Sequence, residues 1–223
     1  MVPPFTTEQF FQVFVAYNTA VWPAQILLVG TAVSCLVLAF RPERWAGKAI
    51  AFGLAALWAW MAVAYHWAFF AEINPAARIF GPLFLVEAAL LLWVGFRTRD
   101  LHFEPRRDLF GVVGGLLAAC ALVVYPLVGM ALGHRYPAQP TFGLPCPTTI
   151  FTVGMLLWLK PKVPWGPLIV PLAWSGIGMT AVFFFGVFED TMLPIATISG
   201  AVLILMKNRR AKTASSERRV PLS

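Results

Sequence analysis

Long apolar stretches alternate with short polar loops along almost the whole chain. A helix needs about 20 apolar residues to cross the hydrocarbon of a bilayer. Seven stretches approach or reach this length, so the pattern predicts an all-α bundle of seven transmembrane helices. The predicted spans are residues 19–40, 49–71, 77–96, 109–133, 144–160, 165–187 and 191–207. The fifth span is short, and prolines lie at both of its ends.

The segments on either side of the spans have a different character. Residues 1–18 contain Thr6 and Gln9 at capping-box spacing, so we expect a short amphipathic helix along the outer interface, with an extension of the first span as the alternative. Its aromatic face would hold Phe10, Phe11, Phe14 and Tyr17. Residues 19–207 then form the transmembrane domain. Residues 208–223 are basic and polar, and we expect a disordered cytoplasmic tail there.

Composition supports a membrane protein and charge predicts its orientation. The chain is 59% hydrophobic and 12% charged, whereas soluble domains carry about 25% charged residues. Of 17 Lys and Arg residues, 15 fall in the loops after the first, third and fifth spans and in the tail; the other two are Arg78 and Arg135. Cytoplasmic loops are enriched in positive charge. The N-terminus is therefore predicted outside and the C-terminus inside, which requires an odd number of spans.

Several classes of function lack their sequence signals. The chain has neither a P-loop nor a GxGxxG motif for nucleotides, and the last span has no lysine inside it for retinal. The basic residues lie at span ends, not on an aromatic and basic surface for nucleic acid. Three distant cysteines form no paired motif. The expected partners are the bilayer and a small solute or ion, and a homo-oligomer is compatible with the sequence.

Glu87 is the most informative single residue, because it lies near the centre of the third predicted span with no charge nearby. A charged carboxylate there costs about 2.5 kcal/mol or more unless it is paired, protonated or hydrated. Intramembrane acids mark paths for protons, cations or substrates. The alternative is a protonated carboxyl that ties neighbouring helices together. We treat Glu87 as a candidate ligand-binding residue.

His66 and Tyr65 lie in the outer half of the second predicted span, beside Trp67. A histidine in this place can ligate a metal, bind a small molecule or transfer protons. The alternative is a neutral histidine that is hydrogen-bonded within an interfacial belt. Both interpretations stay open from the sequence.

Cys146 lies between Pro145 and Pro147. Two prolines remove two backbone donors, so we expect no regular helix before Thr148 and a loop that dips inward. Such a loop would present Cys146, Thr148 and Thr149 to a cavity. A thiolate favours soft metals, and Cys146 with His66 is a candidate metal site; no other cofactor is evident. The alternative is that a threonine caps the fifth span and that Cys146 is inert.

Other polar residues cluster in the outer half of the predicted spans. They suggest an outward-facing vestibule that leads toward Glu87. These residues are Asn18, Gln25, Glu72, Asn74 and Tyr125. Gln25 is included among the candidate binding residues.

Three segments resemble a bacterial membrane family known as domain-of-unknown-function family 6064. They are FTTEQFFQVFVAYNTAVWPAQ, AYHWAFFAEINPAARIFG and GHRYPAQPTFGLPCPTTIFT, the last of which holds the PCPTT segment. The resemblance runs from about residue 5 to 205 and implies a polytopic protein of the bacterial inner (plasma) membrane. It implies no activity, so no residue role comes from it.

Three functions fit the sequence. The first is an outward-facing site that binds or transports a small solute or ion, a soft metal among them. The second is a membrane-embedded enzyme with a thiol and an acid/base pair, although no catalytic motif supports an enzyme. The third is a structural or accessory membrane subunit without a site.

Overall fold

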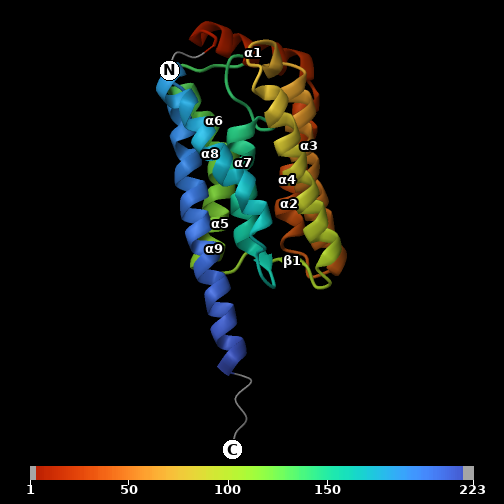
Figure 1. The fold of residues 1–223 in the computed structure, drawn as a ribbon. Coiled ribbons are helices and arrows are strands. Elements are labelled where there is room, and N and C mark those ends of the chain that lie inside the picture. The colour runs from red at the N-terminus through yellow and green to blue at the C-terminus, as the bar shows by residue number, and fades with distance from the viewer. Residues whose placement is uncertain (1–3, 218–223) are drawn as a thin grey trace, which may run out of the picture.

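The computed structural model describes residues 4–217 of the chain, and Figure 1 shows it as an elongated helical bundle. The elements are α1 (Thr7–Val21), α2 (Ala24–Leu38), α3 (Arg44–Trp60), η1 (Met61–Trp67), η2 (Phe70–Glu72), α4 (Ala77–Arg97), β1 (His102–Phe103), α5 (Leu109–Ala119), η3 (Cys120–Val124), α6 (Tyr125–Ala131), α7 (Pro145–Trp158), β2 (Leu159–Lys160), α8 (Gly166–Phe185), η4 (Phe188–Thr191) and α9 (Met192–Glu217).

The predicted all-α class is confirmed, and apolar helices of membrane-crossing length form most of the bundle. Five helical stretches of the described chain are long and apolar enough to cross a bilayer, or six if α1 and α2 together count as one span. Large apolar side chains cover the outside, among them Phe96 at 80% and Phe183 at 75% exposure. A large apolar outer surface of this kind is compatible with a membrane protein.

Helix α1 begins with the predicted capping box, which is confirmed. The Thr6 hydroxyl accepts from the Gln9 backbone N–H, and the Gln9 side chain accepts from the Thr6 N–H. Helix α1 ends before Pro23, and α2 leaves at 87° to it. Helix α1 therefore lies across one end of the bundle (Figure 1), with Phe10 and Phe14 buried on its inner side.

Helix α7 runs through the middle of the bundle, and every one of its residues except Cys146 is buried. The expectation of irregular backbone before Thr148 is wrong, because α7 begins at Pro145. The first turn of a helix has no intrahelical partners for its N–H groups, so Pro145 and Pro147 remove no helical hydrogen bond there. The Thr148 hydroxyl accepts from the Gly143 N–H at 3.0 Å, which holds the preceding loop against the helix.

Asn18 joins α1 to α2 and to the loop before α7. Its amide nitrogen donates to the carbonyls of Pro137 at 2.6 Å and Gln139 at 2.8 Å. Its amide oxygen accepts from Gln25 at 2.7 Å and from Thr141 at 2.8 Å. Asn18 is fully buried and uses all of its usual hydrogen-bonding capacity. The loop is thereby tied to the bent helix pair.

Helices α5 and α7 touch through glycines. A Cβ atom added at Gly154 would lie 2.8 Å from the Gly114 carbonyl oxygen, and one at Gly114 would lie 2.8 Å from the Gly154 oxygen. Small residues allow this close approach of two backbones. A Cβ at Gly176, by contrast, meets nothing within 4 Å, so that glycine is not needed for helix contact.

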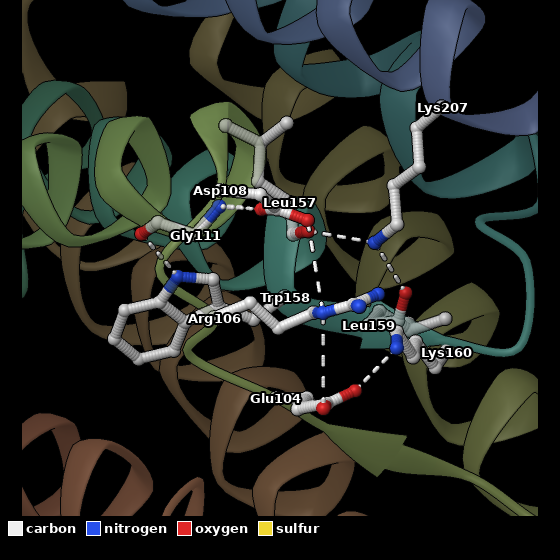
Figure 2. Close-up of polar contacts among 9 residues, drawn as sticks. All are labelled: Glu104, Arg106, Asp108, Gly111, Leu157, Trp158, Leu159, Lys160 and Lys207. Atoms are coloured by element: carbon white, nitrogen blue, oxygen red, sulfur yellow. Dashed lines mark hydrogen bonds and ion pairs between the residues drawn. The ribbon is translucent and has the colours of Figure 1, made fainter. Parts of the chain in front are cut away.

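The opposite end of the bundle is closed by a polar cluster around the β1–β2 pair (Figure 2). The strands pair antiparallel, with His102 opposite Lys160. Lys160 forms an ion pair with Glu104, and its hydrogen bond holds the pKa of that carboxyl below the usual value. Lys207 of α9 donates to the carbonyls of Leu157 and Leu159 at 2.7 and 2.8 Å. This lysine thus satisfies carbonyl groups at the end of α7.

The same contacts bring the predicted basic loops to one end of the molecule. An ion pair joins Arg44 at the start of α3 to Asp100 after α4. Helix α9 also differs from the expected disordered tail, because it stays helical to Glu217, well into residues 208–223 (Figure 1). Residues 218–223 lie outside the described residues.

Candidate functional site: a cavity against helix α1

A partly enclosed cavity of about 370 Å³ lies at the α1 end of the bundle. Segments from α1, η1, α4, α6, α7, α8 and η4 surround it. Its lining residues are Phe5, Phe10, Phe14, Tyr65, Phe70, Asn74, Ala76, Phe80, Tyr125, Pro140, Leu144, Pro145, Cys146, Pro147, Trp174, Ile177, Gly178, Thr180, Ala181, Phe185 and Asp190. The lining is mostly apolar and aromatic, with a few polar side chains.

Aromatic rings form a continuous wall of this cavity. Phe185 of α8 stacks on Phe10 at 4.6 Å between ring centroids and on Phe5 at 5.0 Å. Phe70 lies edge-on to Phe5 at 5.8 Å and stacks on Tyr65 at 5.5 Å. These contacts also hold α1 on the bundle, because its aromatic side chains supply one side of the wall.

The polar side of the cavity is built from residues far apart in the sequence. The Tyr125 hydroxyl of α6 donates a hydrogen bond to the Asp190 carboxylate of η4. The Cys146 thiol of α7 lies near Asp190 and near the Trp174 indole of α8. The indole N–H of Trp174 has no hydrogen-bond acceptor within the described residues. One acid, one phenol, one thiol and one indole N–H therefore lie beside a largely apolar space.

Glu189 lies next to Asp190 but points elsewhere. It is fully buried, and one of its carboxylate oxygens lies 2.8 Å from the His134 ring nitrogen. Its other oxygen has no partner within the described residues. Glu189 does not line the cavity. The two adjacent acids thus have different surroundings, one facing the cavity and the other facing the loop after α6.

The structure brings together only part of the predicted site. Tyr65 and Cys146 line the cavity, and so do Asn74 and Tyr125 of the expected vestibule. Gln25 belongs to the Asn18 hydrogen-bond network instead, where it donates to Asn18 and Thr141. Two further candidates, Thr148 and Thr149, are fully buried and outside the cavity lining.

His66 and Glu87 also lie outside the cavity lining. His66 is enclosed by aromatic rings, with Phe84 at 4.5 Å and Trp174 at 5.2 Å between centroids. Neither of its ring nitrogens has a hydrogen-bond partner, and neither carboxyl oxygen of Glu87 has one, within residues 4–217. The cavity lining therefore stops short of Glu87, and His66 contacts this lining only through rings such as Trp174 and Tyr65.

The surroundings of Cys146 bear on two predictions, a soft-metal site and a reactive thiol. Across residues 4–217, no three His, Cys, Asp or Glu side chains gather as a metal site requires. A soft-metal site at Cys146 and His66 stays a prediction. Reactive cysteines occupy electropositive surroundings, whereas the ionisable neighbour of Cys146 is the acid Asp190.

Sequence reasoning missed Asp190 and Trp174 as site residues. The available signal for Asp190 was weak: two adjacent acids directly before a long apolar stretch. Trp174 lies in an apolar stretch with nothing to set it apart from lipid-facing residues. Only the packing of α6, α7 and α8 brings these side chains together.

Comparison with known proteins identifies a family. No curated protein and no solved structure matches the chain significantly. The model of a family of unknown function, DUF6064, matches residues 7–215. That is most of the chain, and it agrees with the resemblance of the PCPTT region. The chain therefore belongs to the family of unknown function DUF6064.

Proposed function

We propose that this protein is a multi-pass membrane protein that binds a small organic molecule in the cavity against α1. The observation that carries the proposal is the construction of the cavity. Small-molecule sites are concave spaces of about 300–1,000 Å³, lined by apolar and aromatic groups with a few placed polar groups. The cavity of about 370 Å³, its aromatic wall and its polar side around Asp190 have these properties.

The proposed membrane arrangement has seven crossings, with the N-terminus and the cavity on the outer side of a bacterial inner membrane. Helix α1 then lies along the outer interface, and α2 and α7 are the two short crossings. At about 1.5 Å per residue, the 15 residues of α2 span about 22 Å. Helix α7 is shorter still at 14 residues, but it is enclosed by other helices and need not match the lipid thickness.

Reporter fusions test this arrangement. A reporter active only in the cytoplasm should be active when fused after Arg219 and silent when inserted in the 134–142 loop. The physical reason is that the proposed seven crossings place 15 of the 17 basic residues on one side of the membrane, and cytoplasmic loops are enriched in positive charge. Activity at the inserted position and silence at the C-terminus would reverse the orientation and place the cavity on the cytoplasmic side.

Protection of Cys146 tests binding. In a Cys35→Ala, Cys120→Ala background, Cys146 is the remaining thiol, and it lines the cavity. We expect benzyltrimethylammonium or its uncharged analogue of the same shape, neopentylbenzene, to slow alkylation of Cys146 by N-ethylmaleimide. A bound molecule would cover the thiol and exclude the reagent.

A matched pair of variants tests whether the probe that protects Cys146 binds in the cavity. Ile177→Trp fills the cavity and should abolish it, whereas Ile169→Trp adds the same volume on an exposed face of the same helix and should leave it unchanged. If neither probe slows alkylation in the parent protein, the proposed function is wrong. Equal protection in both variants would place the bound molecule elsewhere.

A further inference from the structure

The charges around the cavity are unbalanced. Asp190 is the single acid of the lining, and the lining contains no lysine, arginine or histidine. Asp190 is 4% exposed and forms no ion pair with any basic side chain of residues 4–217. The neighbouring Glu189 adds a second buried acid, which is paired with His134 at 2.8 Å. The cavity thus presents an acid without a cation of its own.

A charged carboxylate that is buried without a counter-ion is unfavourable, because its desolvation is compensated only by pairing or by hydrogen bonds as long as it stays ionised. Asp190 has one such bond from Tyr125 and a weak thiol neighbour in Cys146. The open side of the Asp190 carboxylate has space for an additional group, since the carboxylate borders the cavity. A positively charged ligand group placed there would supply the missing partner.

The aromatic wall favours the same chemistry. The faces of Phe, Tyr and Trp rings attract cations within about 6 Å of the ring centroid. Trp174, Tyr65 and Phe80 border the cavity together with Asp190. Their rings pack edge to face around His66, with Trp174 and Phe80 at 5.4 Å. Aromatic cages recognise quaternary ammonium groups in proteins.

Resting on the proposed function, we propose that the ligand of this cavity is an organic cation. Its ammonium group would lie against Asp190, and its apolar body would lie against Phe10, Phe70 and Phe185. Tyr125 orients the carboxylate by its hydrogen bond. The ligand class is therefore a small amine or quaternary ammonium compound with an aromatic or aliphatic body.

The wild-type protein tests the ligand class without any substitution at the site. Benzyltrimethylammonium and neopentylbenzene differ in charge but hardly in shape, so their affinities isolate the contribution of the charge. We expect the cation to bind at least about tenfold more tightly at equal free aqueous concentration and mildly alkaline pH. The measurement is the concentration of each probe that halves the rate of Cys146 alkylation.

Two variants then test which of the two adjacent acids, Asp190 or Glu189, causes the preference for the cation. Asp190→Asn keeps an acceptor for Tyr125 but removes the charge, so the preference for the cation should fall to about twofold or less. Glu189→Gln changes the adjacent acid, which does not line the cavity, and should keep most of the preference. Thermal unfolding of each variant shows whether the bundle stays intact.

The outcomes separate the two proposals. Equal binding of both probes to the wild-type protein would overturn the organic-cation inference and leave the small-molecule site standing. Binding of neither probe would overturn both. A cation preference that survives Asp190→Asn and is lost in Glu189→Gln would overturn the role given to Asp190. If Asp190→Asn does not fold, the wild-type comparison still decides the ligand class.

Discussion

Asn18→Ala should destabilise the protein by about 3 kcal/mol, because it leaves several buried polar groups without partners. The carbonyls of Pro137 and Gln139 would lose their donors, and Gln25 and Thr141 would lose a shared acceptor. These groups are buried or partly buried between α1, α2 and the loop before α7. Titration with a denaturing detergent, followed by circular dichroism, measures the free energy of unfolding.

A neighbouring residue gives the control for this substitution. Gln12 lies on α1 with an exposed side chain, so Gln12→Ala changes the same helix without burying or orphaning a polar group. It should change the unfolding free energy by less than about 0.5 kcal/mol. Equal stability of the two variants would show that the Asn18 network does not hold α1 on the bundle.

Gly154→Val should cost about 3 kcal/mol or more, because overpacking at a close helix contact cannot be relieved by side-chain rotation. The added Cβ would lie 2.8 Å from the Gly114 oxygen and 3.1 Å from the Ala118 nitrogen, and both are backbone atoms of α5. Relief requires separation of α5 from α7. The same detergent titration measures this loss.

Gly176→Val is the matched control in a second helix. A Cβ at Gly176 meets nothing within 4 Å, so the added methyl groups face open space. We expect an unfolding free energy within about 0.5 kcal/mol of the wild-type value. No loss in Gly154→Val would contradict the close approach of α5 and α7, and an equal loss in Gly176→Val would show that the cost does not come from that approach.

The helical class and the positions of most helices followed from the sequence alone. The reason is that the length of an apolar run, read against the thickness of a bilayer, is a local property of the chain. The capping box of Thr6 and Gln9 was also local, because the two residues lie within one helical turn. Sorting of basic residues between alternate loops predicted that these loops share one end, and contacts such as Arg44 with Asp100 agree.

The fifth predicted span shows where local reasoning was insufficient. Proline was taken as a helix breaker at Pro145 and Pro147, yet α7 begins there. The rule depends on position, since only interior prolines interrupt the hydrogen bonds of a helix. The sequence predicted a separate helix before the first span but did not predict the 87° bend between α1 and α2. Packing of α1 across the bundle end sets that angle.

The candidate site was decided almost entirely by tertiary structure. Cys146 and Tyr65 were predicted for their unusual surroundings in the sequence, whereas Asp190 and Trp174 were not predicted at all. Glu87 attracted attention as a charge within a span but does not border the cavity. Which residues meet depends on how each helix is rotated about its own axis, and uniformly apolar helices carry little periodic signal for that rotation. Side-chain packing between α6, α7, α8 and η4 sets the rotation of these helices. That packing depends on many contacts between residues far apart in the sequence, so no local pattern predicts it.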